Sequence, residues 1–572
     1  MSTLRISLAQ INTSVGDIYG NVKKIKSYID MGRNLGSDII AFPELSITGY
    51  PPEDLLLKPQ FIESNIAAMN EIVQYSKNIV VVFGFVDSDK SILYNSAALA
   101  FNANLISTHR KNLLPNYGVF DEERYFSKGN SCDVFDIDGI KIAISVCEDI
   151  WSDIGPTNIQ SINGAALVIN INASPFHINK RVTREKIITD QAIKNNISIA
   201  YVNQIGGQDE LVFDGSSIIV DNTGKIKSRA SQFNEELLTY DFIINKTTTP
   251  TPSEILKTSK TFLIPTSISQ KSQTIPNRLV SPISSIEEIH QALIIGTQDY
   301  VHKSGFEKVI IALSGGIDSS LVAAIAVEAF GKENVTGISM PSKFSSENSK
   351  TDAYELAKNL DISIETIPIH NMFNTMQDSL SSLFNNLDWD VTEENMQSRI
   401  RGNITMALSN KFNSMVLTTG NKSEMAVGYA TIYGDMAGGF AVIKDVPKLK
   451  VYELCKHINN KSDSEIIPSS VINKPPSAEL RYDQKDSDSL PAYEVLDAIL
   501  EEYIENDTSY EDIIKLGFDE NTIFEIIKLV DRTEYKRRQS APGVKITNKN
   551  FGRDRRMPIT NKYYPFGLKD KN

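Results

Sequence analysis

The sequence predicts an α/β protein with two folded parts. Short apolar runs alternate with helical patterns in residues 1–245 and again in residues 285–572, and such alternation is typical of α/β folds. Between these parts, residues 246–284 are rich in Ser, Thr, Pro and Lys, a composition typical of a linker. The chain has 572 residues, more than one ordinary hydrophobic core accommodates, so at least two domains are expected.

In the first part, short apolar runs predict strands at 38–42, 140–146, 165–172 and 197–203. A helical pattern over residues 184–196 separates the last two of these runs. Within the linker, the apolar run 262–264 is a candidate segment for docking elsewhere on the protein.

In the second part, strands are predicted at 309–313, 335–340, 362–368 and 415–419. Helical patterns follow Ser319 and cover residues 348–360. This alternation predicts a parallel, doubly wound sheet, in which ligands bind at the carboxyl ends of the strands.

Composition excludes several classes of protein. A hydrophobic content of 41%, a charged content of 23% and a net charge of -13 describe a soluble protein that is not a general nucleic-acid or anionic-membrane binder. The three cysteines are spaced neither as a disulfide framework nor as a cysteine zinc site, which favours a reducing compartment. We expect a cytoplasmic protein, because the sequence carries no secretory signal pattern and no apolar run of about 18 residues.

Residues 308–330, reading KVIIALSGGIDSSLVAAIAVEAF, combine an apolar strand, a Ser/Gly-rich turn and a helix. Such a turn suits pyrophosphate, because Gly315 and Gly316 allow close backbone approach while Ser314 and Ser319 offer hydroxyl groups. Asp318 adds a carboxylate for Mg2+. The lysine of the usual P-loop is absent, which favours cleavage of ATP between the α and β phosphates. Glycines alone would more often indicate an ordinary turn; the strand, turn and helix together favour the phosphate site.

The SGGIDSS string resembles the pyrophosphate loop of the N-type ATP pyrophosphatases, which include NAD, GMP and asparagine synthetases. The resemblance implies an adenine nucleotide alpha hydrolase-like fold for the second part and ATP as a substrate. The ATP-binding residues that it implies are Leu313, Ser314, Gly315, Gly316, Ile317, Asp318, Ser319, Ser320 and Thr419.

Three segments of the first part carry residue types suited to amide hydrolysis: Glu44 in AFPELSITGY, Lys111 in HRKNLLPNYGVFDEERYF and Cys147 in AISVCEDIW. Alone, the cysteine would more often be an inert core residue, and each charge a solvated one. Together the segments resemble the nitrilase superfamily, which implies an α-β-β-α sandwich over residues 1–245.

By that resemblance Cys147 is the nucleophile, Glu44 the general base and acid, and Lys111 the group that stabilises the oxyanion. Glu122 matches a glutamate that supports the lysine, although Asp121 and Glu123 adjoin it. The glutaminase subgroup implies glutamine-binding roles for Tyr117, Ser174 and Lys180, for which ordinary loop polarity remains the alternative.

The second part continues through LTTGNKSEMAVGYATIYGDMAGGFAVIKDV, ELRYDQKDSDSLPAYEVLD and EYKRRQSAPGVKIT, which closely resemble the glutamine-dependent NAD synthetases. By resemblance Asn403, Glu424 and Lys536 contact deamido-NAD, although Glu424 could instead bind Mg2+. The basic tail of residues 536–556 is either a solvated face or, at Lys536, part of the nucleotide site.

The resemblance covers nearly the whole chain and implies that glutamine, ATP and deamido-NAD are the substrates. It also implies an ammonia channel and homo-oligomers. The alternatives are an amidotransferase of the same pyrophosphatase family with another acceptor acid, and a metabolite-binding scaffold with inactive sites. Intact Glu44, Lys111, Cys147, Ser314 and Asp318 speak against the scaffold.

Overall fold

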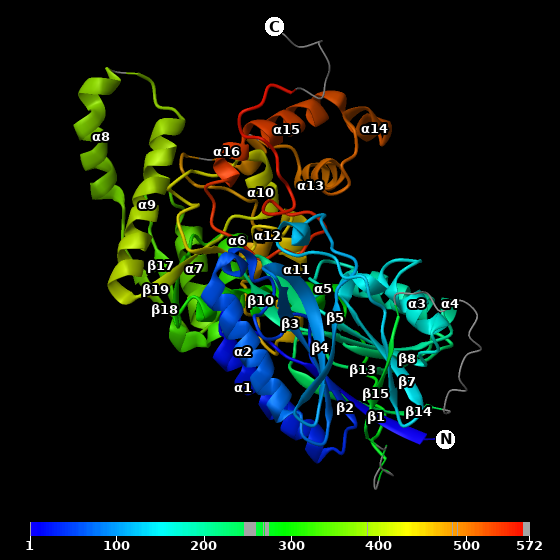
Figure 1. Ribbon diagram of the computed structural model, residues 1–572. Helices are drawn as coiled ribbons and strands as arrows, with labels where there is room; N and C mark the ends of the chain where they lie inside the picture. Colours follow the sequence, from blue (N-terminus) through cyan, green and yellow to red (C-terminus); the bar gives the residue numbers. More distant parts are fainter. Residues whose placement is uncertain are drawn as a thin grey trace. The chain divides into compact units, whose positions relative to one another are not determined.

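The computed structural model describes residues 2–244, 259–266, 268, 271, 274–385, 387–482, 484–488 and 490–563. The chain divides into two compact units, the first comprising residues 1–208 and 212–284 and the second residues 209–211 and 285–572 (Figure 1). Of the predicted linker, residues 246–258, 267, 269, 270, 272 and 273 lie outside the described residues.

The first unit contains two large sheets. Its six-stranded sheet runs in the order β14 (Glu236–Ile244), β1 (Ser2–Gln10), β2 (Ile39–Ala41), β3 (Val80–Asp89), β4 (Ile92–Phe101) and β5 (Asn104–Arg110). Its seven-stranded sheet runs in the order β13 (Ile226–Arg229), β12 (Ile218–Val220), β9 (Ser198–Asn203), β8 (Leu167–Asn172), β7 (Ile140–Val146), β6 (Val134–Ile137) and β15 (Thr261–Ile264). A small two-stranded sheet joins β10 (Ile205–Gln208) to β11 (Leu211–Asp214).

Alternating side chains of these strands enter different cores, because successive residues of a strand point to opposite faces. Val80 and Val82 of β3 belong to the core between the sheets, together with Ile142 and Ile144 of β7. Val81 packs instead in the core beneath α1 (Ile18–Asn34) and α2 (Pro59–Tyr75). The second sheet packs its outer face against α4 (Lys180–Lys194), with α3 (Pro156–Ile162) nearby along β7. These layers confirm the predicted α-β-β-α sandwich.

The sheets contain all four strands predicted for this part, as β2, β7, β8 and β9. The predicted helix over residues 184–196 is α4, which begins four residues earlier than expected. The apolar run inside the predicted linker forms β15, which pairs in parallel with β6 and stacks Phe262 on Phe135.

The second unit contains a five-stranded parallel sheet in the order β18 (Ser363–Thr366), β17 (Val335–Ser339), β16 (Lys308–Ala312), β19 (Ser414–Thr418) and β20 (Phe440–Ala441). Its helices are α5 (Ser285–Lys303), α6 (Ile317–Phe330), α7 (Glu347–Asn359), α8 (His370–Phe384), α9 (Val391–Phe412), α10 (Lys422–Val427), α11 (Lys448–Lys461) and α12 (Ser469–Asn473), followed by α13 (Tyr493–Leu500), α14 (Tyr510–Lys515), α15 (Glu520–Arg532) and α16 (Glu534–Arg537).

This strand order confirms the predicted doubly wound fold. The sheet grows from β16 in both directions, so the chain changes direction between β16 and β19, where the carboxyl ends of two adjacent strands diverge. Such a switch point is where ligands bind in folds of this kind. Helices α10, α13 and α15 share a separate apolar core beside the sheet. Among the described residues, none of the helices combines the length and apolar character that crossing a bilayer requires.

Candidate active sites

Glu44 lies three residues after β2 and is fully buried in the first unit. Its Oε1 accepts hydrogen bonds from Lys111 Nζ at 2.8 Å and Asn95 Nδ2 at 2.7 Å, and its Oε2 accepts one from the backbone N of Ala173 at 3.0 Å. The turn packs so closely on β3 that a Cβ at Gly84 would lie 2.1 Å from the backbone nitrogen following Glu44. The carboxylate is therefore held in one position by three donors and a close backbone contact.

Lys111 follows β5 and bridges two carboxylates. Its Nζ donates to Glu44 Oε1 and, at 2.9 Å, to Glu122 Oε1, which also accepts a hydrogen bond from Tyr50 Oη at 2.9 Å. Desolvation opposes the charged form of the lysine, but Glu122 and Glu44 outweigh it and raise the Lys111 pKa. The structure thus holds a buried ammonium ion at a fixed point.

Glu122 is the buried member of a run of three acidic residues. Glu123 is exposed and forms a surface ion pair with Lys128, while Asp121 is half-buried. Desolvation and the charge of Glu44 raise the Glu122 pKa to about 7, against the opposing attraction of Lys111. Burial therefore distinguishes the three neighbouring acidic residues, because of these three only Glu122 is buried and hydrogen-bonded to Lys111.

Cys147 directly follows β7 and opens a tight turn, Cys147–Ile150. Its φ of 42° lies in the left-handed region, which a non-glycine residue occupies only under constraint, as at many active sites. Burial, followed by the charge of Glu44, raises the pKa of the thiol well above its usual value, while Lys111 acts in the opposite direction. The thiol is therefore protonated at rest, and a base must remove its proton before it can attack.

Asp149 fixes the cysteine turn to the lysine segment. Its carboxylate accepts backbone hydrogen bonds from Val146 at 3.1 Å and from Asn112 and Leu113 at 2.9 Å, and contacts His109 Nε2 at 2.9 Å. The residue is fully buried. This positioning role was not predicted from the sequence, because an aspartate two residues after a cysteine carries no signal of long-range contacts.

The predicted glutamine-binding residues surround this cluster. Tyr117 is half-exposed and donates its hydroxyl to Glu148 at 3.1 Å, beside the cysteine. Ser174 is buried and donates its backbone N to Asn203 at 2.9 Å. Lys180 lies 4.3 Å from the Trp151 ring centroid, and desolvation followed by the charge of Arg184 lowers its pKa, although the thiolate form of Cys147 acts in the opposite direction.

In the second unit, a cavity of about 300 Å³ opens at the switch point of the sheet. The turn after β16 lines it from Leu313 to Ser319, together with Thr419 after β19 and Glu424 on α10. The structure thus brings together all but one of the predicted ATP-binding residues. The exception is Ser320, which is buried and donates its hydroxyl to the Gly316 carbonyl at 2.9 Å.

The turn after β16 leaves a helix terminus facing this cavity. Gly315 has a φ of 76°, and a Cβ there would lie 2.1 Å from the Ser349 carbonyl oxygen, so a side chain does not fit. Helix α6 begins at Ile317, and no side chain of the described residues caps its amino terminus. Its first N–H groups therefore suit an anion such as pyrophosphate.

Lys448, the first residue of α11, joins two of the predicted acidic residues. Its Nζ lies 2.5 Å from Asp318 Oδ2 and 3.3 Å from Glu424 Oε1, while Asn421 Nδ2 donates to Asp318 Oδ1 at 2.9 Å. Desolvation, with the charges of Asp318 and Asp486, raises the Glu424 pKa to about 8, although Lys448 opposes this. Lys448 was not predicted from the sequence, because a single lysine after a proline has no distinguishing pattern.

Asp318 and Glu424 together fit a hard divalent cation. Their oxygen atoms are the ligand type that Mg2+ prefers, and both side chains line the cavity beside the free amino terminus of α6. The ammonium of Lys448 pairs with both carboxylates, so the two side chains already face a positive charge.

Further cations line the cavity without having been predicted: Lys350, Arg401 and Lys474. Arg401 donates its Nε to the Met340 carbonyl at 3.0 Å, and desolvation lowers its pKa to about 10. These cations and the helix terminus suit a polyphosphate ligand.

Two residues assigned to deamido-NAD do not line this cavity. Asn403 is exposed on α9, although its neighbour Gly402 lines the cavity. Lys536 is half-buried and donates its Nζ to the carbonyls of Gly428 and Ala430 at 2.8 and 2.9 Å, so it holds the loop whose residue Ala430 reaches the cavity. The rest of the basic tail is largely paired, as in the ion pair of Lys545 with Asp554.

Comparisons with known proteins divide the chain in the same way. Residues 5–249 match the carbon-nitrogen hydrolase family, and residues 289–540 match the NAD synthase family. A glutamine-dependent NAD(+) synthetase of Thermotoga maritima is 46% identical over 98% of this chain and 99% of its own length.

Two solved structures are similar over nearly the whole chain. One is the glutamine-dependent NAD+ synthetase of Acinetobacter baumannii in complex with ADP, which is 41% identical, covers 97% of this chain and 98% of its own, and has a TM-score of 0.74. The other is a glutamine-dependent NAD(+) synthetase of Cytophaga hutchinsonii, with 23% identity, 98% coverage of both chains and a TM-score of 0.82, which supports the fold alone.

Proposed function

Because the chain belongs to the family of glutamine-dependent NAD(+) synthetases, we propose that it hydrolyses glutamine and uses the ammonia and ATP to amidate deamido-NAD to NAD. The observation that carries this proposal is the presence of two chemically complete sites in one chain. The first holds Cys147, Glu44 and Lys111 in one buried cluster. The second holds a pyrophosphate-type turn beside two carboxylates.

In the first site, Glu44 takes the proton of the Cys147 thiol as sulfur attacks the glutamine carboxamide carbon. Lys111 stabilises the negative charge that develops on the carbonyl oxygen, because its ammonium is fixed by Glu44 and Glu122. Glu44 then returns the proton to the departing nitrogen, which leaves as ammonia, and a thioester remains on sulfur. Water, deprotonated by Glu44, hydrolyses the thioester to glutamate and restores the thiol.

Around this centre, Tyr117, Ser174 and Lys180 are proposed to bind glutamine. The support is their place beside the cysteine turn: Tyr117 contacts Glu148, and the Lys180 charge interacts with both Cys147 and Glu148. Glu122 is proposed to support Lys111, because its carboxylate accepts a hydrogen bond from the ammonium and is the second negative partner of the lysine.

In the second site, ATP is proposed to bind along the turn after β16, with its phosphates at the amino terminus of α6. The carboxylate of deamido-NAD attacks the α phosphate, giving an acyl adenylate and pyrophosphate, and ammonia then displaces AMP to form the amide. Adenylation is needed because a carboxylate is a poor acyl donor. Asp318 and Glu424 would hold Mg2+, which when bound neutralises charge on the departing pyrophosphate.

For Glu424, contact with deamido-NAD remains the alternative to a metal role. Lys536 acts on the nucleotide site through the loop of Gly428 and Ala430, which its ammonium fixes. Asn403 is proposed to contact deamido-NAD outside the cavity.

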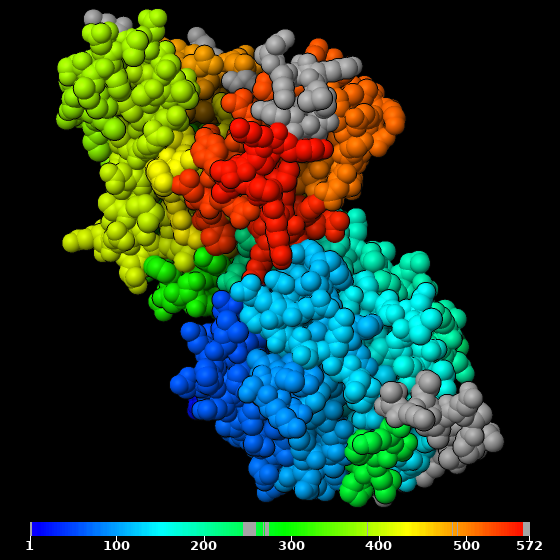
Figure 2. Space-filling view, turned by 45° about the horizontal axis from the view of Figure 1, so that its top comes forward, coloured from blue at the N-terminus to red at the C-terminus, as the bar shows by residue number. Residues whose placement is uncertain are grey.

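We also propose that copies of this chain assemble into homo-oligomers. Large apolar side chains are exposed where α8 passes into α9, at Leu383, Leu387, Trp389 and Val391. Figure 2 shows α8 and α9, in yellow-green, at the surface of the second unit. An exposed apolar patch of this kind is typical of a protein–protein contact.

The proposal is tested by measuring AMP, glutamate and the amidated product with ATP, glutamine and one acceptor acid at a time. We expect AMP to form with deamido-NAD, and NAD to accumulate with it. AMP formation with xanthosine monophosphate or aspartate instead would indicate another amidotransferase of the pyrophosphatase family. An absence of AMP with all acceptors would indicate a scaffold.

A further inference from the structure

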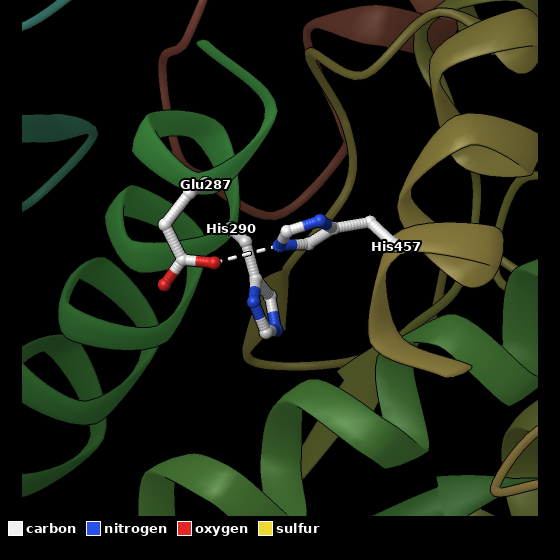
Figure 3. A group of neighbouring side chains, drawn as sticks. All are labelled: Glu287, His290 and His457. Atoms are coloured by element: carbon white, nitrogen blue, oxygen red, sulfur yellow. Dashed lines mark hydrogen bonds and ion pairs between the residues drawn. The ribbon is translucent and has the colours of Figure 1, made fainter. Parts of the chain in front are cut away.

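A cluster of potential metal ligands lies apart from both candidate active sites. Glu287 and His290 lie three residues apart on one face of α5, and His457 faces them from α11 (Figure 3). One ligand atom from each of the three residues lies within 4.8 Å of the others. His457 Nε2 is 2.6 Å from Glu287 Oε2. Helix packing therefore gathers two imidazoles and a carboxylate from distant parts of the sequence.

His290 is the member of the cluster whose ring nitrogens lack hydrogen bonds. Its side chain is fully buried, yet neither ring nitrogen has a hydrogen-bond partner in the described part of the chain. Glu328 on α6 lies 3.1 Å from His290 Nε2, without the geometry of a hydrogen bond. Because a buried polar group without a hydrogen bond is costly, an imidazole in this position calls for a ligand.

We propose that Glu287, His290 and His457 bind a divalent transition-metal ion of the Zn2+ class. Imidazole and carboxylate ligands suit Zn2+, whereas Mg2+ prefers oxygen alone. In a tetrahedral zinc site neighbouring ligand atoms lie about 3.3 Å apart. In this structure the ligand atoms lie within 4.8 Å of one another, so binding of an ion would draw them closer together.

Glu287 is suited to be the anionic ligand. Lys461 Nζ and Gln291 Nε2 donate to its Oε1 at 2.9 and 2.8 Å, which fixes the carboxylate while Oε2 faces His457. Ligating carboxylates are commonly held by hydrogen bonds of this kind.

The position of the cluster indicates a structural ion rather than a reacting one. Helix α11 carries the active-site residue Lys448 in its first turn and the cluster residue His457 further along. The two residues are nine positions apart on the helix, or about 14 Å. An ion at the cluster would therefore join α5 and α11 behind the nucleotide cavity without entering it.

The test is zinc titration of metal-stripped, full-length protein in excess Mg2+, which occupies oxygen-only sites. The variant is His457→Gln, and the matched control is His302→Gln, an exposed histidine of the same helix α5. Loss of a partner outside the ligand set already lowers metal affinity by about 10- to 100-fold, so losing a ligand is expected to cost at least about 100-fold. We expect wild type and His302→Gln to bind one Zn2+ that His457→Gln loses, and Co2+ to give a tetrahedral absorption band only in the first two.

Equal zinc stoichiometry and affinity in wild type and His457→Gln would overturn the proposal. A second measurement needs no variant: crystals of wild type grown with Zn2+ are examined by anomalous diffraction at the zinc edge. We expect a peak within bonding distance of His290 and His457. Zinc bound only at Cys147 or on the surface would show that the cluster is an ion pair between helices.

Discussion

The two candidate sites differ in how they treat charge. In the first unit, Glu44, Lys111 and Cys147 are at most 4% exposed, and their charges are balanced within the cluster. In the second unit, carboxylates and cations line an open cavity of about 300 Å³. The difference follows from the proposed substrates, since an amide carries no charge at the reacting carbon whereas ATP brings several negative charges. The charges of the first site are therefore balanced before its substrate binds, whereas the charges of the second site are complemented by its substrate.

The electrostatics of the two sites follow the same division. Burial and Glu44 keep the Cys147 thiol protonated, so its reactivity depends on a base, and the charge of Glu44 already acts on the thiol. In the second site, burial with neighbouring Asp318 raises the pKa of Glu424 to about 8, and a bound cation would lower it.

The largest expected effect abolishes the function of the first site and leaves that of the second unchanged. Cys147→Ala should lower glutamine-dependent NAD synthesis by at least about 10⁴-fold, because no other group forms the thioester, and should leave synthesis from ammonium salts unchanged. Product formation is measured with each nitrogen donor. Cys132→Ala, at a buried cysteine of the same unit, is the control and should retain both activities. Equal loss with both donors would contradict the division of roles.

Asp318→Ala should lower synthesis with either donor by about 100- to 1,000-fold, because the carboxylate helps hold cationic charge on the departing pyrophosphate. AMP formation is measured with glutamine and with ammonium. Asp361→Ala removes an exposed carboxylate of the same unit and should have no effect. Normal AMP formation in Asp318→Ala would exclude the proposed role.

Glu122→Gln should lower the rate of glutamate release by about 10- to 100-fold, since Lys111 loses one of two anionic partners. Glu123→Gln, one residue along and exposed, is the matched control. An equal effect of both substitutions would show that the acidic run acts only through its overall charge.

The same residue predicts a pH dependence. With a raised pKa of about 7, Glu122 is ionised above that pH and protonated below it. Glutamate release by wild type should therefore fall as the pH drops through about 7, and this step should be missing in Glu122→Gln. A step of the same size in the variant would assign it to another group.

A smaller effect should link the two sites. Deamido-NAD with ATP is expected to raise glutamate release by about 10-fold, because binding energy that differs between two states of the enzyme shifts their populations. Glutamate is measured with and without the nucleotides, and 15N from glutamine is traced into NAD in excess unlabelled ammonium. Equal glutamate release with and without the nucleotides would contradict the coupling. Extensive dilution of the 15N label would contradict the channel.

The smallest effect concerns Lys536. Its ammonium fixes the loop of Gly428 and Ala430, so Lys536→Ala should cost about 1 kcal/mol, or a fivefold higher KM for ATP or deamido-NAD. Lys528→Ala, on the exposed face of α15, is the control. An unchanged KM for both nucleotides would show that the contact of Lys536 with this loop does not affect the nucleotide site.

Local pattern alone was sufficient for several elements of the fold. The strands β7, β8, β9, β16, β17 and β19 were predicted because each is a short apolar run buried on both faces. The turn from Ser314 to Ser319 was predicted because the glycines, hydroxyls and following helix are adjacent in sequence. Such features depend on neighbouring residues, so they can be read without knowledge of the fold.

The contacts that complete each site were decided only by tertiary structure. Glu122 differs from Asp121 and Glu123 by burial against Lys111, and Lys448 joins Asp318 across 130 positions of the sequence. The cluster of Glu287, His290 and His457 likewise exists only because α5 packs against α11. The reason is physical: the charge state and contacts of a side chain depend on burial and on partners from distant segments, which helix and strand periodicity do not encode.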